Sequence, residues 1–445
     1  MKNLKALGLV SFFILLITNN ILIAQEHQTP LNAEEKNTVV DSIGNKLKST
    51  YIFPEVAEEM VNLIEKKLKK GKYKDISDPY EFASSLTEDL LSISHDKHIR
   101  VRFAPEAIAA RQEVHTPQDS IDFQNNYINN LKRGNFGFKE VAILDGNIGY
   151  LDLRSFSDVA HAGPTAVAAM NFLSNSDAII IDLRNNGGGS PAMIQLITSY
   201  LFSSNSVHLN NFYWRPTDRH TQTWTLPHVQ GTRSPDTEVY VLTSNRTFSA
   251  AEEFSYNLKN LNRATLIGET TGGGAHPGGT VNATDRFTVW IPSGRAINPI
   301  TNTNWEGTGV VPDIKVSSDK ALEVAQIKAL ESILEKSQDQ EQKQFMQWYL
   351  DALNIKQEPV VLNESVMKSY IGAFGPRKIS FKNNTLYYQR DEGTIYELIP
   401  LTQNKFMLKG LSSFRIKFIS ENDEIVALEG NYDNGRTDKN LKNKS

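Results

Sequence analysis

Cysteine is absent from the 445 residues of the chain, so neither a disulfide nor a lipidated cysteine is expected. Long apolar runs are also missing after residue 25, where nothing approaches the roughly 18 consecutive apolar residues that a membrane helix needs. Basic residues are not in excess, because 47 lysines and arginines against 51 acidic residues give a formal net charge of −4. We therefore expect no broad basic surface for a phosphate backbone and no nucleic acid partner.

The first 24 residues have the composition of a secretory signal peptide. Two lysines precede an apolar run over residues 6–23, and polar residues begin directly after Ala24. We predict a signal peptide over 1–24, export to the periplasm or the extracellular space, and no stable membrane insertion after cleavage. An uncleaved membrane anchor is the alternative, because Leu22 is larger than the residue usually found two places before a cleavage site.

The rest of the chain is long enough for two or three domains, and its 40% hydrophobic and 22% charged residues are ordinary for a folded protein. Apolar residues repeat at helix spacing between residues 33 and 94, which predicts an N-terminal helical domain over 26–103. Alternating apolar residues predict a small antiparallel β sheet or barrel over 358–445, after a polar helical linker over 336–357.

Between these parts, short apolar runs alternate with helical segments over 104–335. The first two runs are residues 148–153 and 178–183, and their continuous apolar character is typical of strands that are buried on both faces. Strands that alternate with helices predict a parallel sheet with right-handed crossovers, so the core belongs to the α/β class. Functional residues are then expected in the loops at the carboxyl ends of the strands.

The first of these loops, residues 184–190, contains three consecutive glycines before a helix that Pro191 opens. Its backbone N–H groups suit either a phosphate or the oxyanion of acyl transfer. The lysine and the hydroxyl residue of a P-loop are missing, and so is the third glycine of the dinucleotide-binding spacing. A plain glycine turn is the alternative.

The second loop places Ser249 where a strand has ended and a helix begins. At a helix N-terminus, the dipole and the free N–H groups favour negative charge that develops on an attacked carbonyl, so Ser249 is a candidate nucleophile. A serine at this position also serves as a simple helix cap, which is the alternative interpretation.

The third loop, residues 268–278, offers only His276 as a candidate catalytic residue. His95 and His98 lie three residues apart, but nothing nearby suggests a third metal ligand, so we predict no metal site.

Five segments in this order resemble the carboxy-terminal processing, or tail-specific, serine peptidases, in the branch that includes tricorn protease and interphotoreceptor retinoid-binding protein. They are HDKHIRV at 95–101, DLRNNGGG at 182–189, FSAAE at 248–252, GETTGGG at 268–274 and WEGTGVVPD at 305–313. Each motif is weak alone, but the five together span roughly residues 34–316.

The resemblance implies that Ser249 is the nucleophile of the family's Ser-Ala-x-Glu motif. It also implies an oxyanion hole made of the Ala250 N–H and one glycine of the pair Gly188 and Gly189. In the tricorn-like branch a histidine from the N-terminal side is the base and a downstream glutamate orients it. These two roles map onto His98 and Glu306, a chemically consistent triad.

The chain departs from the bacterial processing peptidases in two ways. Those enzymes use a lysine base in the loop where Gly273 and Gly274 stand here, and this chain has no lysine there. They also carry a PDZ domain, for which the chain between Phe103 and Gly146 is too short. If His98 is not the general base, the alternatives are His95, Ser94 and His276. In a purely structural interpretation, His98 begins a strand and Glu306 lies in a surface turn.

We therefore predict an α/β protein with a crotonase/ClpP-like core, an N-terminal helical domain and a C-terminal small antiparallel β domain. Its expected activity is hydrolysis of peptide bonds in a peptide or protein substrate through an acyl-enzyme, with no metal or organic cofactor. The oligomeric state is left open. The alternative is a non-catalytic binding protein for apolar ligands or peptides, because the retinoid-binding relatives carry such ligands on the same scaffold.

Overall fold

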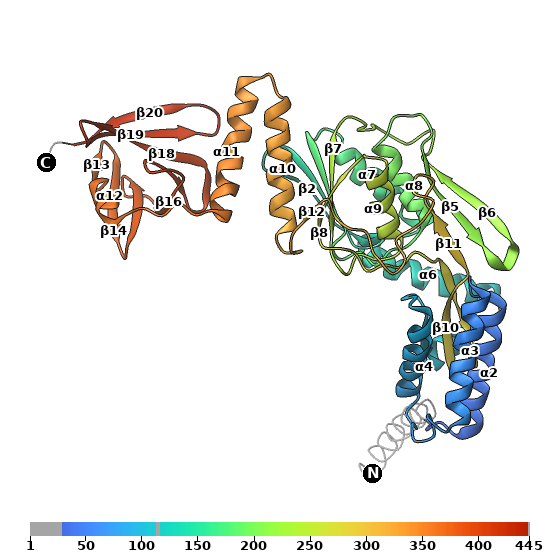
Figure 1. The fold of residues 1–445 in the computed structure, drawn as a ribbon. Coiled ribbons are helices and arrows are strands. Elements are labelled where there is room, and N and C mark those ends of the chain that lie inside the picture. Colours follow the sequence, from blue (N-terminus) through green and yellow to red (C-terminus); the bar gives the residue numbers. More distant parts are fainter. Residues whose placement is uncertain (1–28, 113–115, 444–445) are drawn as a thin grey trace, which may run out of the picture.

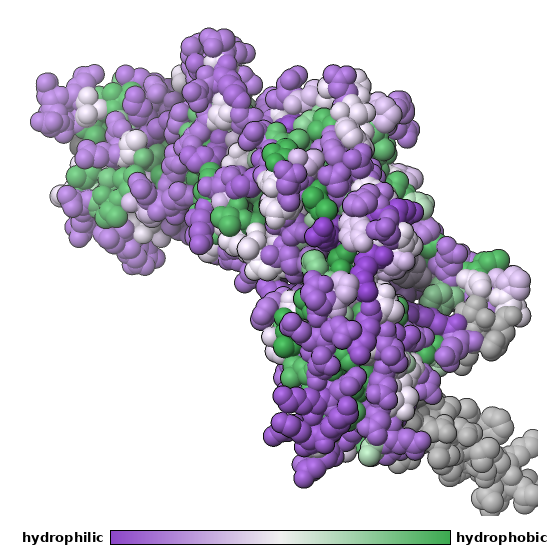
Figure 2. Space-filling model, turned by 45° about the vertical axis from the view of Figure 1, so that its right-hand side comes forward, coloured by the Kyte–Doolittle hydropathy of each residue, from purple (hydrophilic) through white to green (hydrophobic). Residues whose placement is uncertain are grey.

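The computed structural model of the protein describes residues 29–112 and 116–443 (Figure 1). The predicted signal peptide over 1–24 lies outside the described residues. In the part of the chain that is described, no helix is long and apolar enough to cross a membrane. The face of the molecule in Figure 2 is mostly hydrophilic, with smaller hydrophobic areas between the polar ones.

The N-terminal region is helical, as predicted. Its three long helices are α2 (Ala33–Thr50), α3 (Pro54–Lys69) and α4 (Pro79–Ser94). The Asn32 side chain caps α2 by accepting from the Glu35 N–H, and Asp78 caps α4 in the same way. Their apolar faces form one buried cluster, to which Val39, Met60 and Leu86 contribute.

A three-stranded antiparallel sheet joins these helices to the middle of the chain. In it, β10 (Phe287–Pro292) lies between β1 (Arg100–Phe103) and β9 (Gly278–Asn282). Val101 pairs with Val289 across β1 and β10, and both belong to the apolar cluster of the N-terminal helices. The N-terminal region is therefore completed by β9 and β10, which begin 175 and 184 residues after the end of β1.

Between β1 and the central sheet the chain is helical, with α5 (Pro105–Gln112), α6 (Pro117–Arg133) and the short 3-10 turn η1 (Asn135–Gly137). A side chain–backbone capping box at Thr116 and Asp119 starts α6.

The central sheet has six strands in the order β12-β8-β7-β4-β3-β2. Their bounds are β2 Phe138–Leu144, β3 Ile148–Leu153, β4 Ala178–Asp182, β7 Glu238–Thr243, β8 Thr265–Gly268 and β12 Ile314–Lys315. Neighbours from β3 to β12 run parallel, whereas β2 pairs with β3 antiparallel, so the sheet is mixed. The predicted α/β class is confirmed, and the crotonase/ClpP-like topology stays a prediction.

Helices cover both faces of this sheet, which explains its continuously apolar strands. On one face lie α7 (Val159–Phe172), α8 (Pro191–Tyr200) and α9 (Ala250–Asn260), and on the other lie α10 (Ala321–Lys336) and α11 (Gln340–Gln357). Neighbouring strand residues alternate between the two layers: Ile179 packs with α7 to α9, and Ile180 packs with α10.

A second small antiparallel sheet extends from the same body, with strand order β11-β5-β6. Its strands are β5 (His208–Trp214), β6 (Arg219–Trp224) and β11 (Gly294–Ile297), and the 3-10 turn η2 (Arg215–Thr217) connects the first two.

The C-terminal region is an antiparallel near-barrel with its own core, as the alternating pattern predicted. After α12 (Glu364–Ser369) come β13 Gly372–Phe374, β14 Arg377–Lys382, β15 Thr385–Arg390, β16 Ile395–Pro400, β17 Lys405–Leu408, β18 Leu411–Glu421, β19 Glu424–Tyr432 and β20 Thr437–Leu441. A bridge between Phe374 and Lys442 brings the two edges of the sheet together. This region and the N-terminal helices lie at opposite ends of the central body (Figure 1).

Candidate active site

A cavity of about 740 Å³ lies where the N-terminal region meets the central body. Segments that are far apart in the sequence line it, and they contribute His98, Gly189, Phe212, Trp214, Ser249, Ala250, Glu253, Ala275, Trp290 and Trp305. Four residues of the predicted site are therefore brought together: Ser249, Ala250, Gly189 and His98. The other two, Gly188 and Glu306, are not among the residues that line the cavity.

Ser249 stands directly before the first residue of α9, at the end of the loop that follows β7. Its backbone has φ 55° and ψ −121°, a conformation that a residue with a side chain rarely adopts. The side chain is half-buried and faces the cavity, and the helix behind it directs its N-terminus there. This arrangement favours negative charge next to the Ser249 hydroxyl.

Glu252 fixes this loop from inside the protein. Its fully buried carboxylate accepts the Ser249 N–H at 2.9 Å, the Thr271 hydroxyl at 2.5 Å, and the N–H groups of Gly273 and Gly274 at 2.6 and 2.8 Å. Burial raises the pKa of Glu252, although the four hydrogen bonds oppose that effect. Glu252 thus ties the Ser249 loop to the glycine loop after β8. The sequence offered this residue only as part of a motif.

The two glycines proposed for the oxyanion hole differ in their hydrogen bonds. The Gly188 N–H donates to the Asn186 side chain at 2.8 Å, so it is already satisfied. The N–H groups of Gly189 and Ala250 find no acceptor among the described residues. Gly188 is needed for close packing, because its φ is 110° and a Cβ there would lie 2.9 Å from the Ala250 nitrogen. The available pair of donors is therefore Gly189 and Ala250.

His98 lies against the residue that precedes the serine. Its ring centroid is 4.6 Å from that of Phe248, and neither ring nitrogen has a hydrogen-bond partner in the described structure. The nearest carboxylate is that of Asp96, whose Oδ1 is 3.7 Å from His98 Nδ1 and accepts the His98 backbone N–H at 3.1 Å. A Cβ on Gly274 would lie 2.7 Å from His98 Cε1, so only glycine lets this loop pass the imidazole so closely.

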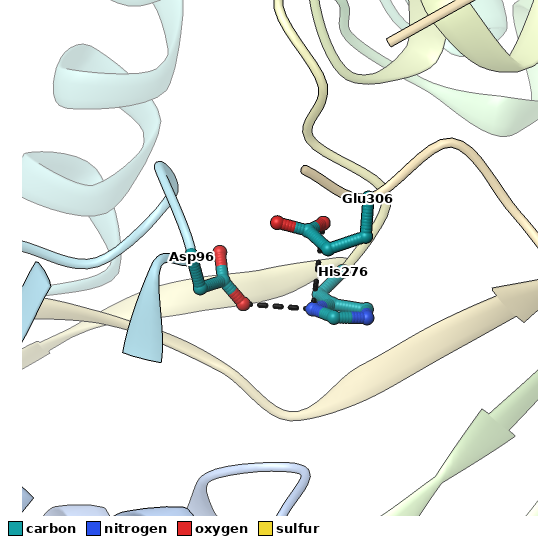
Figure 3. Close-up of side chains that lie close together, drawn as sticks. All are labelled: Asp96, His276 and Glu306. Atoms are coloured by element: carbon teal, nitrogen blue, oxygen red, sulfur yellow. Dashed lines mark hydrogen bonds and ion pairs between the residues drawn. The ribbon is translucent and has the colours of Figure 1, made fainter. Parts of the chain in front are cut away.

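Asp96, His276 and Glu306 form a compact group (Figure 3), and Asp96 is the member of this group that lies next to His98. His276 Nδ1 lies 2.8 Å from Asp96 Oδ2 and 3.4 Å from Glu306 Oε2, and the latter oxygen also accepts the Ala275 N–H at 2.5 Å. One ligand atom from each residue lies within 4.8 Å of the others, so the three residues could hold a divalent cation. The imidazole between two carboxylates satisfies the same atoms without an ion.

The carboxyl groups of this cluster have opposite pKa shifts. Burial alone would raise the pKa of Asp96, but the hydrogen bond of His276 and the nearby imidazole of His98 outweigh burial and lower it. Burial and the nearby charge of Asp96 raise the pKa of Glu306, and the charge of His276 offsets only part of this. Asp96 is therefore the carboxylate that stays ionised next to the two imidazoles.

Glu306 was expected to orient His98, but it pairs with His276 instead. No ion pair joins Glu306 to His98 in the described structure, and Asp96 occupies the position next to the imidazole. Asp96 was not predicted from the sequence, and His276 was expected only as an alternative base. One signal was available: Asp96 stands two residues before His98 within the HDKHIRV motif.

The sequence left three residues open as alternative bases, and none of them lines the cavity: His95, Ser94 and His276. His95 ends α4 in a left-handed conformation and is exposed, and the Ser94 hydroxyl donates to the Leu90 carbonyl within that helix. His276 does not line the cavity, although its neighbours Ala275 and Pro277 do.

Two models of protein families match this chain. Residues 147–316 match the model of peptidase family S41, and residues 32–131 match that of the N-terminal domain of peptidase S41 in eukaryotic IRBP. Together the two ranges span more than half of the chain.

Three solved structures that the chain resembles can be compared with it over most of their length. A peptidase candidate from Parabacteroides merdae is 18% identical, with a TM-score of 0.48 over 66% of this chain and 96% of the other. A lipoprotein from Streptococcus agalactiae is 16% identical, with a TM-score of 0.45 over 68% and 98%. The photosystem II D1 C-terminal processing protease is 15% identical, with a TM-score of 0.41 over 65% and 94%.

Proposed function

Because the chain belongs to peptidase family S41, whose members are serine-type hydrolases, we propose that it cleaves peptide bonds through an acyl-enzyme formed on Ser249. One observation carries this proposal: Ser249, the unpartnered imidazole of His98 and two free backbone N–H groups all face one cavity. Serine, base and oxyanion donors are the three parts that acyl transfer requires.

In the proposed mechanism His98 takes the hydroxyl proton of Ser249 while the Ser249 oxygen attacks the carbonyl carbon of the substrate. The Ala250 and Gly189 N–H groups hold the oxyanion, and His98 then gives its proton to the leaving amine. A water molecule then gives a proton to His98 and attacks the acyl-enzyme. His98 returns that proton to the Ser249 oxygen, which regenerates the serine and releases the acid product. No metal ion or organic cofactor takes part in these steps.

Asp96 is the positioning residue for His98 in this mechanism. Its carboxylate accepts the His98 backbone N–H and lies 3.7 Å from the imidazole, so a small side-chain movement would complete a hydrogen bond to Nδ1. Glu306 acts one step farther away, because it holds His276 and His276 holds the other oxygen of Asp96. We therefore propose that Glu306 supports His98 indirectly, through His276 and Asp96, and not by a direct contact.

We also propose that the protein is exported and meets its peptide or protein substrate in the periplasm or outside the cell. Within residues 1–24, lysines precede an apolar run, and this order supports export. A binding protein on the same scaffold is the second candidate. It would need neither the free N–H groups nor the unpartnered imidazole that the cavity contains.

A serine-reactive fluorophosphonate tests the proposal. We expect the wild type to be labelled on Ser249 and the Ser249→Ala variant to remain unlabelled and unable to hydrolyse peptides. His98→Ala should be labelled at least about 100-fold more slowly, because the hydroxyl keeps its proton. Ser204→Ala, at an exposed loop serine, is the matched control and should react like the wild type. A folded wild type that neither reacts with the label nor cleaves peptides would favour the binding protein.

A further inference from the structure

One wall of the cavity carries a buried acid that the mechanism does not use. Glu253 lies four residues after Ser249 on α9, lines the cavity, and is 4% exposed. Its Oε1 has no hydrogen-bond partner in the described structure. An unpaired carboxyl oxygen in such a place is unusual, because buried polar atoms are almost always satisfied.

The polar neighbours of Glu253 are also incompletely satisfied. Asn210 and Asn257 are 0% and 1% exposed, and the side-chain nitrogen of each has no partner among the described residues. Both amides lie beside the Glu253 carboxyl, where they stabilise its ionised form without a well-aligned hydrogen bond. The group of Glu253, Asn210 and Asn257 therefore has unused hydrogen-bonding capacity, and Glu253 is its member that lines the cavity. The two amides carry no charge that could pair with the carboxylate.

Apolar side chains also line the cavity. Phe212, Trp214 and Trp305 line the cavity together with Ala250 and Ala296. Apolar and aromatic walls that end in one acidic group match a long aliphatic side chain with a cation at its tip. Tryptophan faces add a further attraction for a cation.

The position of Glu253 on α9 relates it to the scissile bond. Ser249 precedes α9, and its carbonyl accepts the Glu253 N–H at 2.9 Å, so Glu253 lies in the first turn of the helix that follows the serine. The residue that becomes attached to the serine is the one before the scissile bond, so we expect its side chain to be the one that reaches Glu253 through the cavity.

We propose that Glu253 makes this protein select substrates with lysine or arginine immediately before the scissile bond. The proposal depends on Ser249 being the nucleophile. Without a substrate, burial raises the pKa of Glu253 to about 7, so the acid is only partly ionised at neutral pH. A substrate cation would favour the ionised form and satisfy the free oxygen.

The mouth of the cavity has the opposite charge, because Lys97, Arg100 and Arg102 line it and are exposed. Exposed charges are screened by salt within about 8–10 Å, whereas a buried acid is screened much less. The rim should therefore affect how fast substrates associate, and the buried acid should affect which side chain is accepted.

The test is a series of otherwise identical peptides with lysine, arginine, glutamine, leucine or glutamate before the scissile bond. We expect the wild type to cleave the lysine and arginine peptides with a kcat/KM at least about 100-fold above the leucine and glutamate peptides. Glu253→Gln should lower kcat/KM for the lysine peptide by about 100-fold and reduce the lysine-to-leucine ratio to within a few-fold of one. Arg100→Gln is the control. It should keep the lysine-to-leucine ratio within a few-fold of wild type while changing the salt dependence of kcat/KM for charged peptides.

Each outcome has one meaning. If Ser249 is labelled and peptides are cleaved without a preference for a cation, this inference is wrong and the proposed function stands. A failure of the wild type to react at all overturns the proposed function itself. If Glu253→Gln lowers all peptides equally, Glu253 has only a structural role. If that variant does not fold, Glu253→Asp keeps the charge, and its loss of the wild-type preference for lysine would contradict selection by charge.

Discussion

The two ends of the molecule are attached to its central body in different ways. The N-terminal helices share an apolar cluster with β10, and β1 is part of the sheet that contains β9 and β10. The segment after α4 supplies His98 and Asp96 to the site. The C-terminal near-barrel keeps a core of its own, and no described residue after 357 lines the cavity. Distance along the chain from Ser249 therefore says little about which part of the protein belongs to the catalytic unit.

The join between the body and the near-barrel depends mainly on α11. Met346 and Leu350 on this helix pack with α10, while the Trp348 side chain donates to the Ser412 carbonyl at 2.9 Å. The buried guanidinium of Arg415 stacks 3.9 Å from the Trp348 ring. One helix thus has one face in each unit, and cutting after it should separate them.

The largest expected effect follows removal of the N-terminal region. A chain that begins at residue 104 loses β1, which exposes the apolar face of β10, and it loses His98 and Asp96. We expect no cooperative thermal unfolding transition of the body and no fluorophosphonate labelling. A chain that begins at residue 29 is the control and should fold and react. A labelled, cooperatively folded chain from residue 104 would show that the N-terminal region is dispensable.

A smaller but still large loss of activity is expected when the residues that support His98 are changed. Asp96→Asn removes the charge that steadies the protonated imidazole, so kcat should fall by about 100- to 10,000-fold with little change in KM. Glu306→Gln should cost less, because Glu306 contacts His276 and not His98. Steady-state kinetics of both variants check this order, and a greater loss in Glu306→Gln would restore the direct pairing that the sequence predicted.

The third effect is on stability and concerns the body alone. The pKa of Glu253 is raised from 4.5 to about 7, so the folded protein keeps a proton that the unfolded chain loses in that range. Wild-type stability should fall as pH rises from about 4.5 to about 7, and the loss is complete above pH 7.

Glu253→Gln removes this loss, so its free energy of unfolding relative to wild type should rise by about 3 kcal/mol across the same range. Denaturant unfolding at several pH values measures the difference. If the two units unfold separately, only the transition of the body should change. An equal change in the C-terminal transition would mean that the units are coupled.

The smallest effect is expected from truncation after Gln357. The cavity and its supports stay intact, so the rate of fluorophosphonate labelling should stay within about twofold of wild type, although the Trp348 face becomes exposed. Loss of labelling together with loss of the thermal transition would place the near-barrel in the catalytic unit and end the contrast between the two ends.

The sequence predicted those parts of the fold in which the local pattern of apolar and polar residues matches the burial of these residues in the structure. Residues 178–182 are uninterruptedly apolar up to Asp182 because both faces of β4 are covered, and that pattern is visible without a structure. The loop before Pro191 and the serine before α9 were found for the same reason, since turns and helix starts have local signals.

The features that were missed depend on long-range contacts. Asp96 and His276 are 180 residues apart, and no local pattern shows that one carboxylate lies between two imidazoles. The pairing of β1 with β10 and the small sheet around β5 were missed for the same reason. Glu253 follows another glutamate on a helix and looks like an ordinary surface residue, although its spacing of four from Ser249 was a usable signal.

The backbone of Ser249 suggests that the protein gives up some stability for its chemistry. A positive φ at a residue with a Cβ is unfavourable by about 1–3 kcal/mol, and glycine relieves it. Ser249→Gly and Ser249→Ala both lack the hydroxyl, so they should be equally inactive, yet the glycine variant should unfold at the higher temperature. Natural selection for stability alone would therefore favour glycine at this position, and the serine marks a trade-off in which function has prevailed.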